Sequence, residues 1–168
     1  MINNFKNVEF KDFEFPKFDE IKKGFLITAG SLNKFNTMTA GWGNFGVFWS
    51  KPSLIVYVRD TRYSYGFFND NEYFTASFLP KTMEKAINLC GTLHGNEVDK
   101  VALSHLTPFS IEKSVAFEQA EKIIVCKKVL HADVVPENMD DPSFDNKIYP
   151  LKDYHRMFFG EIVKIVSK

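Results

Sequence analysis

The sequence has few cysteines, no excess of charge of either sign and no long apolar run, and each shortage excludes a class of protein. Its two cysteines, Cys90 and Cys126, lie far apart in 168 residues and cannot form a disulfide scaffold for a chain of this size. Twenty-one basic residues balance twenty-one acidic ones, which leaves no overall charge to attract nucleic acid or an anionic membrane. No segment is long and apolar enough to span a membrane and the first residues resemble no targeting signal, so we expect a cytoplasmic protein.

Motifs of nucleophilic, phosphate-loop and metal chemistry are also absent from the sequence. No serine lies in a Gly-Xaa-Ser-Xaa-Gly elbow, and the loop over residues 91–95 lacks the Gly-Lys-Ser/Thr ending of a phosphate loop. His94 follows Cys90 closely, but Cys126 has no second ligand at a recognisable spacing, so we expect no metal site. We interpret Cys90 as a packed thiol near a helix end, because no histidine and carboxylate accompany it as they would a nucleophile.

Phenylalanine is abundant, with 18 residues against 2 Trp and 6 Tyr, so the fold must house many large rings. The length fits a single domain over residues 1–168. Residues 1–20 alternate Phe with charge, and we interpret them as an N-terminal arm that lies on the body of the domain or on a partner. Residues 136–147 are polar and contain two prolines, which predicts a surface insertion.

The remaining chain predicts many short strands and a few helices. Apolar runs rich in β-branched and aromatic residues favour strands, while Gly, Pro and capping residues mark the ends of elements. We expect strands over residues 24–30, 53–58, 73–79, 109–111, 116–118, 122–135 and 157–166, a turn over 31–36, and helices over 82–91 and 98–103. A further short helix follows residue 59, with Asp60 or Thr61 as its cap. This order predicts a mostly β fold with short helices, in which a β-barrel carries a helical excursion.

Residues 36–49 combine both tryptophans with three of the nine glycines. Glycine weakens a strand unless a bulge or a close approach of the backbone requires it. Hydroxyl, amide and free N–H groups could bind the polar edge of a flat ligand here, while Trp and Phe cover its face. The alternative is a tight turn beside an aromatic cluster, and this stretch alone favours neither interpretation.

Two arginines, a tyrosine and a serine follow the strand over 53–58, namely Arg59, Arg62, Tyr63 and Ser64. The N-terminus of the helix expected there has unpaired N–H groups and the positive end of a dipole, which suits a phosphate. The alternative is a surface arginine that pairs with Asp60 beside an ordinary cap. A flat-ligand surface and a phosphate seat one strand apart together indicate a nucleotide-like cofactor.

Two other residues have both a structural and a functional interpretation. His155 precedes the last strand among aromatic and charged residues, where it could act as an acid or base or could simply pack. Lys100 follows Asp99 in the second helix, and such pairs are commonly exposed and contribute little to stability. The residues alone do not decide between the two interpretations of His155.

Seven motifs occur in order between about residue 24 and residue 166. They are Asn36-Xaa-Met38-Thr39-Ala40-Gly41-Trp42-Gly43, Trp49-Xaa-Lys51-Pro52, Val58-Arg59-Xaa-Xaa-Arg62-Tyr63, Phe74-Thr75-Xaa-Ser77-Phe78-Leu79-Pro80, Cys90-Gly91, Val98-Asp99-Lys100, and Tyr154-His155 before Gly160-Glu161-Ile162. Together these motifs resemble the flavin reductase-like, FMN-binding family, which includes flavoredoxin. The resemblance implies an FMN-binding split β-barrel, a homodimer with the flavin near the subunit interface, and non-covalently bound FMN.

The resemblance also implies roles for individual residues. The cofactor-binding set is Asn36, Thr37, Met38, Thr39, Ala40, Gly41 and Trp42 at the isoalloxazine ring, Arg59, Arg62, Tyr63 and Ser64 at the ribityl phosphate, and Lys100 near the flavin. His155 is the candidate catalytic residue, near the reactive face of the ring or the dimer contact. Family members often carry Ser-Gly-Arg ahead of the Asp-Lys pair, whereas this chain has His94-Gly95-Asn96, which removes a cation and puts a phosphate or nicotinamide contact there in doubt.

The function that these observations favour is an FMN-dependent oxidoreductase of the flavin reductase type. It would pass electrons from NAD(P)H through bound FMN to free flavin, a metal complex or a protein acceptor. One alternative is a flavoredoxin-like electron carrier that a redox protein partner reduces, and another is a non-catalytic flavin-binding module. The final acceptor, the choice between NADH and NADPH, and the choice between FMN and FAD stay open at this stage.

Overall fold

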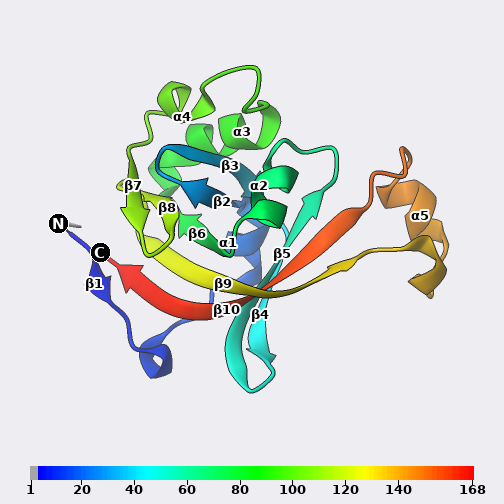
Figure 1. The fold of residues 1–168 in the computed structure, drawn as a ribbon, viewed down its shortest axis with the longest axis horizontal. Coiled ribbons are helices and arrows are strands. Elements are labelled where there is room, and N and C mark those ends of the chain that lie inside the picture. Colours follow the sequence, from blue (N-terminus) through cyan, green and yellow to red (C-terminus); the bar gives the residue numbers. More distant parts are fainter. Residues whose placement is uncertain (1–3) are drawn as a thin grey trace.

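One strongly curved antiparallel sheet organises residues 4–168, which are the residues that the computed structural model describes (Figure 1). Its strands follow the order β3 (Lys34–Ala40), β2 (Phe25–Ser31), β6 (Tyr73–Phe78), β9 (Lys122–Asp133), β10 (His155–Ser167), β5 (Lys51–Arg59) and β4 (Gly43–Phe48). A short strand, β1 (Lys6–Asn7), pairs with the end of β10 and so lies beside the C-terminus. This strand content confirms the prediction of a mostly β fold with short helices.

Helices cover one end of the sheet. Helix α3 (Glu84–Thr92) packs on β2 and β3, and α4 (Lys100–Leu103) packs on α3 (Figure 1). A separate hairpin of β7 (Pro108–Ile111) and β8 (Ser114–Phe117) follows them, and β8 packs on β2 and β6. The other short helices are α1 (Phe18–Lys23), α2 (Ser64–Asp70), α5 (Ser143–Ile148) and the 3-10 turns η1 (Phe10–Asp12), η2 (Lys81–Met83) and η3 (Pro136–Asn138). The helices gathered in the middle of the chain form the predicted helical excursion.

Strand β2 shows why the sheet is buried on both faces. Phe25 and Ile27 pack into the central core together with Phe158 of β10. Leu26 lies between them in the sequence and packs on the other face against Ile87 of α3. Because successive side chains of a strand point to opposite faces, a strand that is covered on both faces reads as a continuous apolar run.

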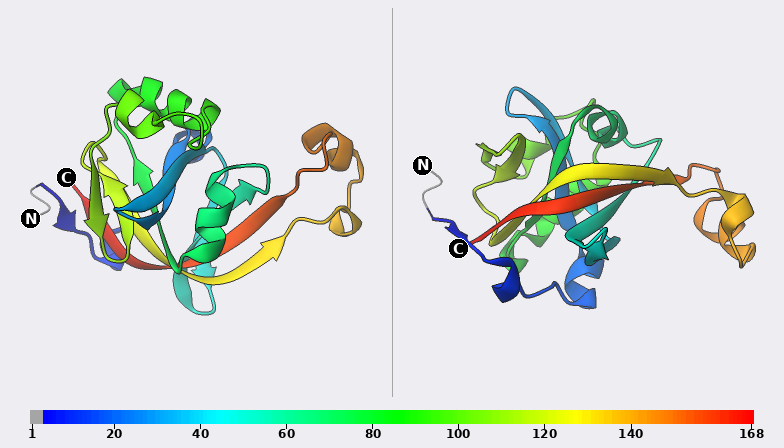
Figure 2. Two further views of the ribbon diagram at one scale, coloured as in Figure 1. Left: turned by 45° about the horizontal axis from the view of Figure 1, so that its top comes forward. Right: turned by 60° about the horizontal axis from the view of Figure 1, so that its bottom comes forward.

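Strands β9 and β10 run past the rest of the sheet and carry η3 and α5 at their far end (Figure 2). The segment predicted as a surface insertion, residues 136–147, contains η3 and all of α5 except its last residue, Ile148. Residues 1–3 of the predicted N-terminal arm lie outside the described residues, and the rest of the arm forms β1, η1 and the start of α1. Within residues 4–168, no helix combines the length and the apolar character that crossing a bilayer requires.

The loop after β5 differs from the sequence-based prediction. Helix α2 begins only at Ser64 with Tyr63 as its N-cap residue, so neither Asp60 nor Thr61 caps it. The reason is a pair of tight turns, in which the N–H of Arg62 bonds to the carbonyl of Arg59 and the N–H of Tyr65 bonds to that of Arg62. The capping signal in the sequence therefore belongs to a turn.

Two smaller corrections concern β3 and α3. The turn expected over 31–36 is shorter, because β3 already begins at Lys34 and pairs there with Ser31. The helix predicted over 82–91 was expected to have Thr82 as its N-cap and Gly91 just past its end, but Gly91 lies inside α3, which continues to Thr92. Helix α3 begins at Glu84 with Met83 as its N-cap residue, so Thr82 is not the cap.

Candidate functional site

The ends of β5 and β10 bring Arg59 and His155 directly opposite each other in the sheet. The ring of Trp42, in the turn between β3 and β4, lies 4.5 Å from the His155 imidazole, centroid to centroid. Tyr57 of β5 adds an edge contact to Trp42 at 6.1 Å. The sheet thus assembles residues from three distant parts of the sequence into one aromatic wall, in which Trp42 keeps 45% of its surface exposed.

Arg59 is held by the segment that leads from α5 back to β10. Its guanidinium lies 2.6 Å from the carboxylate of Asp153 and donates to the carbonyl of Ile148 at 3.0 Å. It also lies 5.2 Å from the centre of the Tyr149 ring. The hydrogen bond from Arg59 lowers the pKa of Asp153. A guanidinium has five N–H donors, so these partners leave part of its capacity for a ligand.

Two further cations lie near the end of α3. Arg62 donates to the carbonyl of Gly91 at 2.9 Å, and Lys100, which is only 3% exposed, donates to the carbonyl of Leu93 at 3.3 Å. Burial and the charge of Arg62 lower the pKa of Lys100 to about 8, against an opposing effect of Cys90. Burial and the nearby charge of Arg59 lower the pKa of Arg62.

Neither Arg62 nor Lys100 lies within ion-pair distance of a carboxylate in the described part of the chain. Taking a cation out of water without a partner is unfavourable, so a bound anion would offset the cost. Lys100 was interpreted from the sequence alone as one of an exposed pair, and its burial corrects that interpretation. Its neighbour Asp99 instead caps α4, accepting a hydrogen bond from the N–H of Ala102.

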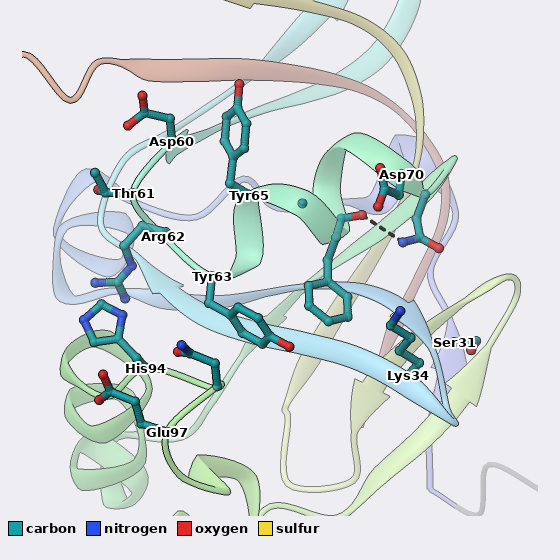
Figure 3. A pocket seen from close by; sticks show the side chains of 14 residues that line it. Ser31, Lys34, Asp60, Thr61, Arg62, Tyr63, Tyr65, Asp70, His94 and Glu97 are labelled. Carbon is teal, nitrogen blue, oxygen red and sulfur yellow. Dashed lines mark hydrogen bonds between the residues drawn. The ribbon is translucent and has the colours of Figure 1, made fainter.

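A cavity of about 760 Å³ lies beside Arg62, between the loop after β5, α2, the β2–β3 turn and the loop that follows α3 (Figure 3). The charged side chains on its wall are Asp60, Asp70, Glu97, Lys34 and Arg62. The rings of Tyr63, Tyr65 and Phe67 also line it. Carboxylates therefore outnumber cations along this wall, although Arg62 is one of its members.

A hydrogen bond between Asn36 and Ser64 connects β3 to the start of α2. The side-chain amide of Asn36 donates to the hydroxyl of Ser64 at 2.7 Å, and both residues are buried. Gly95 lies against this pair, because a Cβ atom at this position would stand 2.2 Å from the Asn36 Oδ1 atom. Only glycine fits there without moving Asn36, which explains the glycine between His94 and Asn96.

The rest of the stretch from Asn36 to Trp42 is less open than the sequence suggested. The hydroxyl of Thr37 is buried and bonded to Thr28 and to the carbonyl of Ile27, while that of Thr39 donates to the carbonyl of Ile87. Met38 and Ala40 pack into the central core. The exposed residues of the stretch are Gly41 and Trp42, so a flat ligand would meet this end of β3.

Three contributors to the site were not identified from the sequence, namely Tyr57, Tyr149 and Asp153. The last two stand in the aromatic and charged segment directly before His155, which gave a weak signal. Their contacts with Arg59 depend on the register between β5 and β10, and that register is a property of the assembled sheet.

The thiols play no part in this arrangement. Cys90 and Cys126 are both free and buried, and burial raises the pKa of each. Cys90 packs against Ile87 and Leu26 and lies 3.6 Å from the hydroxyl of Ser104, as expected of a packed thiol. Among the described residues, no three His, Cys, Asp or Glu side chains are grouped to hold a metal ion.

Comparisons with known proteins connect this geometry to flavin binding. Residues 23–168 match the family model of the flavin reductase like domain. Flavoredoxin from Methanosarcina acetivorans is 24% identical, with 86% of this chain and 68% of that chain covered and a TM-score of 0.67. The FMN-binding domain of a flavin reductases-like enzyme from Shewanella baltica is 15% identical, with 98% and 78% covered and a TM-score of 0.69.

A protein with a split barrel domain from Shewanella frigidimarina is 12% identical, with 88% of this chain and 67% of that chain covered and a TM-score of 0.68. At these identities the likeness to solved structures establishes the fold, and the curved sheet is a split barrel. Comparison with curated protein sequences gives no match.

Proposed function

Because the chain belongs to the flavin reductase like family, we propose that it is an FMN-dependent oxidoreductase that takes electrons from NAD(P)H. The electrons would pass to free flavin, a metal complex or a protein. The observation that carries the proposal is a pair of partly or fully buried cations, Arg62 and Lys100. Arg62 lies on the loop that follows Arg59. A bound phosphate monoester would supply the anion that this pair lacks.

The residues present fit a cofactor that combines a phosphate with a flat ring. Arg62 and Lys100 would hold the phosphate, with part of the donor capacity of Arg59 available beside them. Trp42 is exposed at the end of β3 and would cover one side of the ring next to His155. FMN, when bound, accepts a hydride or single electrons and returns them to an acceptor.

The side chains of the protein would then bind and position the cofactor without forming a covalent bond to it. The aromatic wall of Trp42 and Tyr57 would exclude water from one face of the ligand. His155 can offer one hydrogen bond from its free ring nitrogen, since Nδ1 is already bonded to Tyr149. A thiol or hydroxyl nucleophile is not needed for this chemistry, which agrees with the buried, packed state of both cysteines.

The test of the proposed function is anaerobic reduction of FMN-loaded protein. We expect NADH or NADPH to bleach the flavin absorption rapidly, and air to restore it. Flavin that binds but stays oxidised with both nucleotides would contradict the oxidoreductase proposal while leaving FMN binding intact. Reduction by a redox protein under those conditions would then identify an electron carrier, and no reduction by any donor would identify a flavin-binding module.

The electron-carrier alternative is favoured by one specific feature of the chain. The segment His94-Gly95-Asn96 contributes no lysine or arginine, and Glu97 follows it on the wall of the cavity beside Arg62. An acidic wall is a poor surface for the phosphates of a dinucleotide. A protein donor that brings its own cationic surface would meet complementary charge at the same place.

We predict that NADH is a better donor than NADPH by at least about tenfold in kcat/KM. The 2′-phosphate of NADPH would add negative charge next to Asp60 and Glu97, whereas a free ribose hydroxyl can donate to a carboxylate. Steady-state rates with the two nucleotides measure the preference. The Glu97→Gln variant should show a smaller preference for NADH over NADPH. The Glu118→Gln variant, at an exposed position after β8, should show the same preference as the wild type. Faster turnover with NADPH would contradict the charge argument.

We also propose a homodimer in which the β4–β5 hairpin meets a second copy of the chain. Val47 and Trp49 on this hairpin are 78% and 64% exposed, and Trp49 and Ser50 hold left-handed backbone conformations at its tip. Among the described strands β4 pairs only with β5, so its outer edge is open. An exposed apolar edge strand favours association.

The double variant Val47→Asp, Trp49→Ser should convert the dimer to a monomer, because it removes the apolar surface and places charge on the edge. Light scattering after size-exclusion chromatography measures the change in mass. Leu151→Ser, at a residue that is 83% exposed after α5, is the matched control and should stay dimeric. A wild-type protein that is monomeric at micromolar concentration would overturn the proposal.

A further inference from the structure

Tyr149 is buried at the junction between the far-end helix α5 and the candidate site. It follows α5, is 5% exposed, and places its hydroxyl oxygen 2.9 Å from the Nδ1 atom of His155. Its ring packs against that of Tyr154 at 4.9 Å, and the guanidinium of Arg59 lies on the ring. These contacts fix the position of the hydroxyl, so the hydrogen bond to His155 is a built feature of the fold.

The direction of this hydrogen bond follows from the donors and acceptors available. A tyrosine hydroxyl has one O–H to donate, and leaving a buried donor without an acceptor is costly. Within residues 4–168 the Nδ1 atom of His155 is the one acceptor bonded to the Tyr149 hydroxyl. The available partners therefore favour the hydroxyl as the donor and the Nδ1 lone pair as the acceptor.

An imidazole that accepts at Nδ1 and is neutral must carry its proton on Nε2. Burial and, to a smaller extent, the charge of Arg59 lower the pKa of His155 to about 4 against the opposing charge of Asp153. The ring is consequently neutral at physiological pH.

We propose that Tyr149 is a positioning residue, which holds His155 in the Nε2–H form so that His155 presents a hydrogen-bond donor beside Trp42. A donor at this place suits a ligand with an acceptor atom on the edge of its ring, such as a carbonyl oxygen or an unprotonated ring nitrogen. A histidine in the opposite form would present a lone pair and would repel the same atom. The benefit to electron transfer rests on the proposed function, but the position of the proton on the His155 imidazole does not.

The inference also gives the segment after α5 a role. Asp153 and the carbonyl of Ile148 hold Arg59, which in turn lies on the Tyr149 ring. Residues 148–153 thereby connect the arginine expected near the phosphate with the histidine expected near the ring. The connection between β9 and β10, which contains η3 and α5, thus contacts the candidate site through these residues.

The direct test is nitrogen-15 NMR of the histidine side chains in FMN-free protein at pH 7. We expect His155 in the Nε2–H form in the wild type, and a clear change of the Nδ1 chemical shift in Tyr149→Phe, because that variant leaves the Nδ1 lone pair without its donor. Tyr154→Phe is the matched control, because its hydroxyl donates to Asp145 and not to His155. A wild-type Nδ1–H form, or a Tyr149→Phe spectrum that is unchanged, would overturn the proposal.

A second measurement connects the Nε2–H form of His155 to the rate of flavin reduction. In FMN-loaded protein, Tyr149→Phe should lower the rate of flavin reduction about tenfold while FMN affinity changes little. Glutamine at position 155, His155→Gln, carries a donor without titrating and should retain more activity than His155→Phe. Equal activity of these two variants would contradict the donor role. Absence of reduction in the wild type would defeat the proposed function and leave the NMR result to stand alone.

Discussion

Replacing Arg62→Ala is expected to weaken FMN binding by about 100-fold. The variant removes a half-buried cation that lies close to Lys100 and Arg59, and a charge-assisted hydrogen bond to a desolvated phosphate contributes about 3 kcal/mol or more when its neighbours remain. Titration of apo-protein with FMN, followed by quenching of flavin fluorescence, measures the change. The double variant Arg59→Ala, Arg62→Ala should lose still more affinity.

Lys34→Ala is the control for this prediction, because Lys34 lines the same cavity but is exposed and is the first residue of β3. Its affinity should change by less than about threefold, as expected for an exposed charge. Arg62→Lys separates charge from geometry and should bind with intermediate affinity. If the double variant Arg59→Ala, Arg62→Ala bound FMN with the affinity of the wild type, the assignment of the phosphate to this loop would be incorrect.

Replacing Gly160→Val should prevent stable folding or lower the free energy of unfolding by about 3 kcal/mol or more. A Cβ atom at this position would stand 2.6 Å from the Cys126 Cβ and 2.6 Å from the Phe74 ring, both of which are buried. The register of β10 against β9 shifts between Phe159 and Gly160, so the backbone approaches its neighbours closely here. Urea unfolding followed by circular dichroism measures the loss.

Gly66→Ala is the opposite case and serves as the control. Gly66 lies inside α2, and a Cβ atom there would meet nothing within 4 Å. Alanine should therefore raise the free energy of unfolding by about 0.5–1 kcal/mol, because glycine has a lower helix propensity. If Gly160→Val were as stable as the wild type, the close packing of β10 described here would be incorrect.

The strands could be predicted because their signal is local. The apolar run over 24–30 and the β-branched run over 53–58 each became a strand, β2 and β5, and their burial follows from composition. Helix boundaries were predicted less well, since Thr82 and Gly91 carry capping signals that the fold uses otherwise. Sheet order was beyond the sequence, because pairing β5 with β10 depends on contacts between distant segments.

The site divides in the same way. Arg59, Arg62 and Trp42 could be selected as candidates, since two arginines and two hydroxyls follow one strand and both tryptophans lie in one glycine-containing stretch. The buried state of Lys100 and the internal hydrogen bonds of Thr37 and Thr39 were not, because they depend on where α3 and α4 pack. The role of Tyr149 could not be predicted for a related reason, because its contact with His155 forms only when the chain after α5 returns to the sheet.

The central claim is that the split barrel binds FMN through the cations near the end of α3 and uses it for electron transfer. The most direct measurement is the absorption spectrum of the purified protein after incubation with excess FMN and removal of the unbound flavin. We expect a yellow protein with one FMN per chain, whose flavin bands disappear when NADH is added without oxygen. A colourless protein that retains no FMN would contradict the account at its foundation.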